Sequence, residues 1–203
     1  MTLNSLTLIY FSPTGGTQKV LEAIARGMQV RKVEHVNITS PDVAALPLIE
    51  IPADLAVIAV PVYAGRVPLK AIERMQHLRG METPALIVVV YGNREFEDAL
   101  LELKTLAINQ GFRPLAAAAF IAEHSYSTTE TPLAVGRPDP DDLEKARLFG
   151  RQAFEKLQSG DRNSSPLIEV PGNFPHKERV VRPPESPGSR KDLCTLCGTC
   201  ALV

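Results

Sequence analysis

The chain has 203 residues, of which 44% are hydrophobic and 22% charged, and its formal net charge at pH 7 is −1. This composition is typical of a soluble globular protein and excludes a strongly basic nucleic-acid-binding surface. No run of eighteen apolar residues and no signal-peptide pattern occurs. We therefore expect a cytoplasmic protein with one domain and an appendage, and neither nucleic acid nor membrane as a partner. The oligomeric state stays open.

Three runs of apolar residues predict strands that are buried on both faces, as in the middle of a parallel sheet. They cover residues 6–11, 55–60 and 85–91. Weaker patterns predict two more strands, one at 32–38 and one within the alanine-rich segment 112–122. Five strands separated by helical patterns indicate an α/β protein whose parallel sheet carries helices on both faces.

Apolar residues at helical spacing predict four helices. The first follows residues 12–17, and the second begins at Pro68 and places Leu78 on its inner face. The third ends near Gly111. The fourth begins at residues 139–142, where an aspartate, a proline and two further aspartates mark a helix N-terminus.

The segment that joins the first strand to the first helix is Ser12-Pro13-Thr14-Gly15-Gly16-Thr17, with three hydroxyls and two glycines. Free backbone N–H groups and the positive end of the helix dipole make such a position an anion site. The spacing matches neither the Walker A loop nor the dinucleotide-binding G-x-G-x-x-G pattern. Because the segment contains no lysine or arginine, we predict that it binds phosphate with neutral donors. A serine-rich helix cap without a ligand is the alternative.

Three further segments follow predicted strands and are expected at the same edge of the sheet. They are residues 61–68, 91–98 and 123–126. The proposed ligand contacts within them are Pro61-Val62-Tyr63-Ala64-Gly65-Arg66, Tyr91-Gly92-Asn93-Arg94 and His124. A phosphate site beside two loops that carry aromatic residues and glycines suits a ligand with a phosphate at one end and a planar ring at the other. Structural alternatives are edge packing for Tyr63, a surface charge for Arg66 and a loop position without a ligand for His124.

These residues resemble the flavodoxin-like flavoproteins over about residues 3–158. Residues 12–17 resemble the hydroxyl-rich loop that binds the phosphate of FMN in that family, and residues 61–68 and 91–98 match its two loops around the isoalloxazine ring by order and position. The resemblance implies a flavodoxin-like three-layer sandwich with strand order 2-1-3-4-5 and FMN as cofactor. From its position after the fifth predicted strand, and not from the resemblance, we also place His124 near the flavin. The chain has no tryptophan, so Tyr63 and Tyr91 are the aromatic residues available to the ring.

The only cysteines of the chain are Cys194, Cys197 and Cys200, in the spacing C-x₂-C-x₂-C. The absence of cysteines elsewhere argues against a disulfide framework and for metal ligands or redox thiols. Bacterial ferredoxins continue this spacing with x₃-C-P. The chain thus resembles flavodoxin–ferredoxin fusion proteins, in which a flavodoxin domain precedes [4Fe-4S] clusters. We expect the natural protein to continue beyond residue 203 and to use the three cysteines for one cluster. Three thiolates do not complete a four-thiolate site, and an adventitious zinc ion or a disulfide is the expected alternative in this shorter chain.

Composition divides the chain into three parts. Residues 1–160 form the predicted FMN-binding domain, and residues 161–192, with six prolines, form a linker or a wrapped extension. Residues 193–203 are the expected start of a ferredoxin-type module.

Three functions follow from these features. The first is an FMN-binding electron-transfer domain that exchanges electrons with a redox partner protein or a fused ferredoxin domain. The second is an enzyme, an NAD(P)H-dependent flavin or quinone reductase. The third is a phosphate-binding or partner-docking module without flavin. The sequence does not decide whether the chain is an enzyme.

Overall fold

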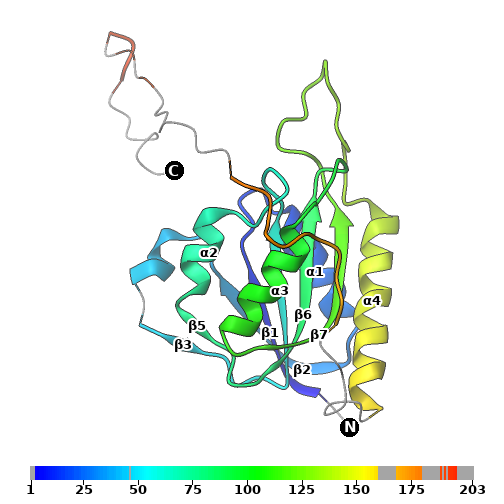
Figure 1. Ribbon diagram of the computed structural model, residues 1–203. Helices are drawn as coiled ribbons and strands as arrows, with labels where there is room; N and C mark the ends of the chain where they lie inside the picture. Colours follow the sequence, from blue (N-terminus) through cyan, green and yellow to red (C-terminus); the bar gives the residue numbers. More distant parts are fainter. Residues whose placement is uncertain are drawn as a thin grey trace.

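The computed structural model describes residues 3–45, 47–159, 168–179, 188, 190 and 192–195 (Figure 1). Its main sheet consists of five parallel strands: β1 (Leu3–Tyr10), β2 (Val30–Asn37), β4 (Leu55–Pro61), β6 (Pro84–Tyr91) and β7 (Arg113–Ile121). They are arranged as β2-β1-β4-β6-β7. Counted along the chain, this is the predicted order 2-1-3-4-5.

Helices cover both faces of the main sheet, as the alternation of patterns predicted. One face carries α1 (Gly16–Arg26) and α4 (Pro140–Gln158), and the other carries α2 (Leu69–Met75) and α3 (Ala99–Asn109) (Figure 1). The result is a three-layer sandwich with a hydrophobic core on each side of the sheet. In the described part of the chain, no helix combines the length and hydrophobicity that crossing a bilayer requires.

The strand β4 explains why the central strands are apolar at every position. Leu55 and Val57 lie in the core beneath α1 and α4, whereas Ala56 and Ile58 lie in the core beneath α2 and α3. All four side chains are completely buried. Full burial of a valine, leucine or isoleucine contributes about 1.5–3 kcal/mol, so each face of the strand stabilises one layer of the sandwich.

Two short strands were not predicted. β3 (Ile49–Glu50) follows a 3₁₀ helix, η1 (Pro41–Ala45), and pairs in parallel with β5 (Leu78–Arg79). The prediction that Leu78 belongs to the second helix is wrong, because α2 ends at Met75. Leu78 is nevertheless completely buried. The helical spacing therefore identified a core position, but the backbone there pairs with β3 instead of continuing the helix.

The start of α4 was predicted within a residue. The N-cap residue Asp139 accepts a hydrogen bond from the backbone N–H of Asp142 (2.9 Å), and the Asp142 carboxylate accepts one from the backbone N–H of Asp139 (3.0 Å). This reciprocal pair is a capping box. Arg137 also donates to Asp142, and this hydrogen bond is the main reason why the pKa of Asp142 lies below its usual range.

Close packing of α1 on α4 depends on two glycines. A Cβ atom on Gly150 would lie 2.0 Å from the backbone oxygen of Ile24, and one on Gly27 would lie 1.9 Å from the backbone oxygen of Arg147. A side chain at either position therefore forces the helices apart, and alanine at Gly150 brings no compensating contact.

We expect Gly150→Ala to lower the free energy of unfolding by about 1–3 kcal/mol, the usual cost of overpacking. Urea unfolding measures this directly. Gly188→Ala is the matched control, because a Cβ atom there has no neighbour within 4 Å. Equal stability of the two variants would contradict the tight contact between the helices.

Candidate functional site

A pocket lies at the carboxyl ends of four strands of the main sheet. Its wall combines residues from the last positions of β4 and β6 and from the loops after β1, β4, β6 and β7: Pro13, Thr14, Gly16, Thr17, Pro61, Val62, Tyr63, Val90, Tyr91, Gly92, Ala122, Glu123, His124 and Ser125. Segments that are far apart in the sequence meet there because parallel strands bring their carboxyl ends to one edge.

The pocket contains many, but not all, of the residues proposed from the sequence to bind a cofactor. Those in its wall are Pro13, Thr14, Gly16, Thr17, Pro61, Val62, Tyr63, Tyr91, Gly92 and His124. Outside its wall are Ser12, Gly15, Ala64, Gly65, Arg66, Asn93 and Arg94. The wall also includes Val90 and Ala122, which were not proposed, and Glu123 and Ser125, which belong to the predicted segment 123–126 around His124.

The first loop is held by hydrogen bonds from within the protein. Ser12 donates its backbone N–H to the Thr39 hydroxyl (2.8 Å), and its own hydroxyl accepts from the backbone N–H of Gln18 (3.0 Å). Gly15, the N-cap of α1, has a left-handed backbone with φ of 80°, which glycine adopts at little cost. Ser12 and Gly15 therefore shape the loop.

Other donors of this loop have no partner within the described part of the chain. The backbone N–H groups of Thr14, Gly16 and Thr17 meet no protein acceptor there. All three residues lie in the pocket wall at the N-terminus of α1, where N–H groups and the helix dipole attract anions. This end of the pocket is thus built to hold a phosphate or another small anion.

A buried arginine braces the segment that supports this loop. Arg74, on α2, is 8% exposed and donates to the carbonyl of Ile38 (2.9 Å) and to that of Thr39. Its guanidinium also lies 5.7 Å from the centre of the Phe11 ring. Neither Thr39 nor Arg74 was proposed from the sequence. Thr39 follows a predicted strand at the same edge, and this position was an available signal.

The loop after β4 places one tyrosine at the pocket. Tyr63 and Arg66 exchange two backbone hydrogen bonds (3.0 and 3.1 Å), and Ala64 and Gly65 form the tight turn between them with φ of 51° and 76°. Tyr63 is 44% exposed. Burial, assisted by the nearby Tyr126, raises the pKa of its hydroxyl, so the hydroxyl stays protonated and can donate a hydrogen bond.

Gly92 and His124 form the opposite part of the wall. A Cβ atom on Gly92 would lie 2.3 Å from Cδ2 of His124, so only glycine lets the imidazole pack here. The ring nitrogen Nδ1 of His124 accepts the backbone N–H of Tyr126 (3.1 Å). A neutral His124 therefore carries its proton on Nε2 and can donate from that atom. Tyr91 lines the pocket and contacts the Phe96 ring edge-on (5.5 Å).

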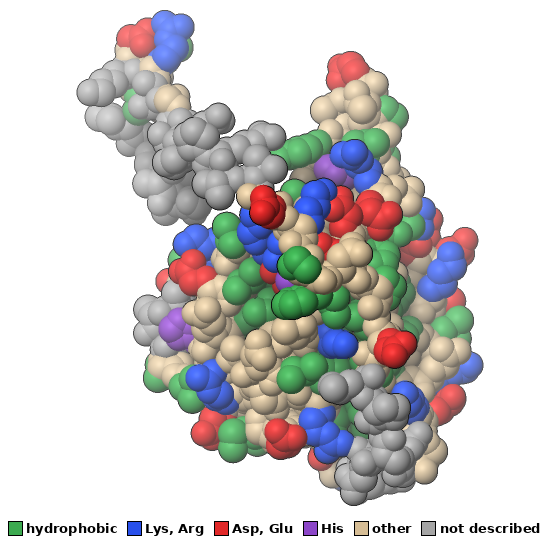
Figure 2. Space-filling view, in the orientation of Figure 1, with side chains coloured by type: hydrophobic (Ala, Val, Ile, Leu, Met, Phe, Trp, Pro, Cys, Tyr) green, Lys and Arg blue, Asp and Glu red, His purple; other side chains and the backbone are tan. Residues whose placement is uncertain are grey.

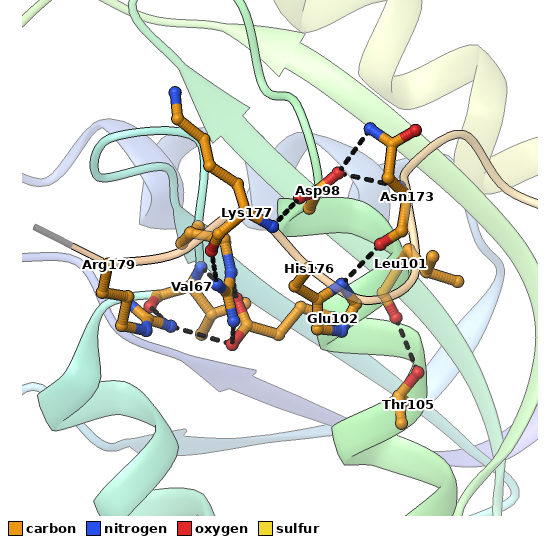
Figure 3. Close-up of polar contacts among 10 residues, drawn as sticks. Val67, Asp98, Leu101, Glu102, Thr105, Asn173, His176, Lys177 and Arg179 are labelled. Carbon is orange, nitrogen blue, oxygen red and sulfur yellow. Dashed lines mark hydrogen bonds and ion pairs between the residues drawn. The ribbon is translucent and has the colours of Figure 1, made fainter.

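Arg66 binds the buried carboxylate of Glu102, on α3, instead of lining the pocket. Its Nε and Nη2 atoms lie 2.9 and 2.7 Å from the two oxygens of Glu102. Glu102 also accepts from the backbone N–H of Val67 (2.8 Å) and from Arg179 (2.8 Å) (Figure 3). Burial alone would raise the pKa of Glu102, but the bonds from Arg66, Val67 and Arg179 hold it below its usual range.

Residues 168–179, called the strap below, lie across α3 (Figures 1 and 3). The carboxylate of Asp98, at the N-terminus of α3, accepts from the backbone N–H of Asn173 (2.8 Å), the Asn173 side chain (3.0 Å) and the backbone N–H of Lys177 (2.6 Å). The bond from Lys177 is the largest of the effects that lower the pKa of Asp98. The strap falls within residues 161–192, which were expected to form a linker or wrapped extension.

The lowered pKa of Asp98 predicts when acid weakens this attachment. A carboxyl whose pKa is lower in the folded state stabilises the protein above its unfolded pKa, about 3.9 for aspartate, and this contribution is lost as pH falls through the folded value. We expect Asp98→Asn to lower the unfolding free energy equally at pH 7 and pH 5, and the difference from wild type to shrink below about pH 4. Urea unfolding at several pH values tests this. A difference that is constant down to pH 2 would contradict it.

The predicted cluster ligands lie mostly outside the described residues. Cys194 is exposed, and Cys197 and Cys200 are not among the residues that the structure describes. Across the described ranges, no group of three or more His, Cys, Asp or Glu residues is placed to hold a metal ion. The [4Fe-4S] site therefore stays a prediction from the sequence.

Three solved structures resemble this chain in fold. A WrbA-like flavodoxin from Agrobacterium tumefaciens has a TM-score of 0.51 and 18% identity, and the match covers 77% of this chain and 98% of that one. A short-chain flavodoxin associated with a bacterial microcompartment has a TM-score of 0.52 and 16% identity over 76% and 98% of the two chains. A flavodiiron core from Synechocystis sp. PCC6803 also has a TM-score of 0.52 and 16% identity; 78% of this chain matches 37% of that chain.

These similarities establish a flavodoxin-like α/β fold. No protein-family model and no curated protein sequence matches the chain. At identities of 16–18%, these similarities show that the fold is shared, and they do not show which ligand this chain binds.

Proposed function

We propose that the chain binds FMN in the pocket at the carboxyl ends of its strands and serves as an electron-transfer domain. The observation that carries the proposal is the set of backbone N–H groups of Thr14, Gly16 and Thr17 at the N-terminus of α1, which meet no acceptor among the described residues. They lie in one pocket with the aromatic residues Tyr63 and Tyr91. A phosphate site joined to an aromatic wall matches the two ends of FMN, and two of the structural neighbours are flavodoxins.

The residues divide into two groups in this proposal. Thr14, Gly16 and Thr17 hold the phosphate through backbone N–H groups and the two threonine hydroxyls, which form strong hydrogen bonds with a charged acceptor, and Pro13 lines the same end of the pocket. Residues around the remaining pocket orient the ring and shield it from water: Pro61, Val62, Tyr63, Tyr91, Gly92 and His124. FMN supplies the electron transfer itself when bound, and the protein provides affinity, orientation and electrostatics.

The C-terminal cysteines suggest the partner. Cys194, Cys197 and Cys200 have the spacing of three ligands of a bacterial [4Fe-4S] cluster. We propose that a fused ferredoxin-type module or a separate redox protein exchanges electrons with the flavin. Iron and sulfide analysis of protein that was reconstituted under anaerobic conditions, with and without Cys194→Ala, tests the ligand assignment.

Titration of FMN fluorescence tests the proposed function. We expect quenching that saturates at one FMN per chain, and protein that stays yellow after gel filtration. Colourless protein that leaves FMN fluorescence unchanged would rule out a flavin and favour the phosphate-binding or docking alternative.

One observation favours a reductase as the second candidate. The wall includes residues 122–125 after β7, so a fourth segment with the imidazole of His124 lies beside the aromatic part of the pocket. Such a wall can position a second planar substrate against a bound ring. Steady oxidation of NAD(P)H by the FMN-loaded protein with a quinone acceptor would support the reductase. Oxidation no faster than with free FMN would favour the carrier.

A further inference from the structure

We propose that the strap, residues 168–179, is a clamp that holds the loop of residues 62–67 against the pocket. The chain that follows the sheet domain thereby contributes to the affinity of the FMN site. This inference rests on the proposed function for its effect on FMN, although the clamp itself is a property of the protein without ligand. The residues that form it are polar and charged groups on α3, in the loop and in the strap.

The strap is fixed to α3 at two levels. Near its middle, the Asp98 carboxylate accepts three hydrogen bonds from Asn173 and Lys177, and Asp98 is only 1% exposed. Gly172 packs so closely on the helix that a Cβ atom there would lie 2.6 Å from Cβ of Leu101. At the start of the strap, Lys104 donates to the carbonyl of Ile168 (3.0 Å). The strap is therefore a bound element along its described length.

The strap also binds the 62–67 loop directly. The Arg179 guanidinium donates to the carbonyl of Val67 (2.8 Å), and Arg66 donates to the carbonyl of Lys177. Lys177 also forms an ion pair with Glu97 (2.6 Å), just before α3. In the space-filling view, basic and acidic side chains gather at the end of this face nearest the pocket (Figure 2). Two hydrogen bonds therefore join the loop and the strap, one donated by each of them.

Glu102 joins the strap, the helix and the loop. Its carboxylate binds Arg66 and the backbone N–H of Val67, both in the loop, and Arg179, the last residue of the strap (Figure 3). The side chains of Glu102, Arg66 and Arg179 are 8%, 11% and 25% exposed. Removal of the strap would leave the Glu102 carboxylate with Arg66 as its one cation in place of two. The loss matters because charge pairs away from water are only weakly screened.

The loop needs such support because its turn is strained. Ala64, a residue with a Cβ atom, has φ of 51°, a conformation that costs a non-glycine residue free energy unless its surroundings maintain it. The backbone oxygen of the next residue, Gly65, accepts from the backbone N–H of Asp98 (3.0 Å). Tyr63 precedes this turn and lines the pocket. Residues 63–66 therefore include a strained turn, a backbone bond to the N-terminus of α3 and a tyrosine of the pocket wall.

Two variants release the strap by different chemistry. Asp98→Ala removes the carboxylate that holds Asn173 and Lys177 but keeps the backbone N–H that donates to Gly65. Gly172→Ala creates a steric collision with Leu101. Neither substitution alters a residue of the pocket wall.

Each variant has a matched control far from the pocket. Asp54→Ala also removes an aspartate that accepts two backbone N–H groups, those of Asn4 and Ser5. Gly111→Ala introduces a side chain at another positive φ, +80°, where the nearest atom would be 3.7 Å away. The controls therefore reproduce the lost hydrogen bonds and the backbone strain without touching the strap.

Amide hydrogen exchange of the protein without FMN tests the clamp, and FMN titration tests its consequence. We expect both strap variants to reduce the protection of the Val67 and Lys177 amides roughly tenfold or more, while the amide of Leu86 in β6 stays protected. The Kd for FMN is expected to rise roughly tenfold in both variants and to stay within about twofold of wild type in both controls.

Release of Lys177 with unchanged protection of Val67 would overturn the clamp. So would an unchanged Kd for FMN in both strap variants. A wild-type protein that binds no FMN would instead overturn the proposed function, and exchange of the Val67 amide would still decide whether the strap holds the loop. Reintroduction of the carboxylate as Asp98→Glu should restore part of the protection lost in Asp98→Ala.

Discussion

The double variant Thr14→Ala, Thr17→Ala is expected to weaken FMN binding by about 3–6 kcal/mol, because each hydroxyl that bonds a charged group contributes about 1.5–3 kcal/mol. Both threonines lie in the pocket wall, and Thr17 is only 3% exposed. The hydroxyls are the side-chain donors beside the unpartnered N–H groups of the same loop. Fluorescence titration of the variant against wild type measures the loss.

Two further variants make this measurement specific. Thr17→Ser restores a hydroxyl at a buried position and should recover part of the affinity. Thr105→Ala removes an exposed threonine whose hydroxyl donates within its own helix, to the Leu101 carbonyl (2.9 Å), and should leave the affinity unchanged. An affinity equal to wild type in the double variant would mean that another part of the protein binds the phosphate.

Removal of the Glu102 carboxylate is expected to have the largest effect on stability. Glu102→Ala leaves the Arg66 guanidinium without its two bonds and removes an acceptor of Arg179 and of the Val67 N–H. Breaking a buried ion pair by removal of one partner costs about 3–5 kcal/mol, because the remaining charge stays in a poorly solvated place. We expect the unfolding free energy to fall by about that amount, as measured in urea.

An exposed pair supplies the comparison. Glu144 binds Arg147 on the surface of α4 (2.6 Å), and their side chains are 52% and 39% exposed. Such a pair contributes about 0–1 kcal/mol, so Glu144→Ala should change stability little. Similar losses of unfolding free energy for Glu102→Ala and Glu144→Ala would contradict the expected stabilisation by the buried carboxylate of Glu102.

The sequence predicted the sheet well because burial on both faces leaves a strong pattern. Residues 55–60 and 85–91 are apolar at every position, and the structure places them in β4 and β6 between two layers of helices. The strands β3 and β5 left no such pattern, because each has only two residues and pairs with a segment far away in the sequence. A wrapped extension was one of two expectations for the segment that contains the strap, but its partners on α3 could not be predicted, since the hydrogen bonds to Asp98 follow no sequence periodicity.

The sequence located the pocket but not the orientation of each side chain in it. Residues after each strand were expected at one edge, and residues from four of these segments line the pocket. Arg66 shows the limit of this reasoning. Arg66 lies outside the pocket wall because its guanidinium binds Glu102, which is 36 residues later in the chain, and no local sequence pattern identifies that partner. Ser12 is a second example, because its hydroxyl accepts the backbone N–H of Gln18, in the first turn of α1, and Ser12 lies outside the pocket wall.

The residues that the sequence did not indicate fall into two groups. Val90 and Ala122 lie at the predicted ends of strands, directly before segments that were proposed, so extension of those segments into the strands would have included them. Thr39 and Arg74 act behind the first loop and never reach the pocket wall. Supporting residues of this kind become visible only when the helices are placed on the sheet.

A comparison of FMN with riboflavin tests the central claim most directly, because the two ligands differ only in the phosphate. If the N–H groups of Thr14, Gly16 and Thr17 bind that phosphate, wild-type protein should bind FMN roughly 100-fold more tightly than riboflavin, or more, since each bond to a charged group contributes about 1.5–3 kcal/mol. Equal affinity for the two ligands, or no binding of either, would contradict the assignment of this pocket.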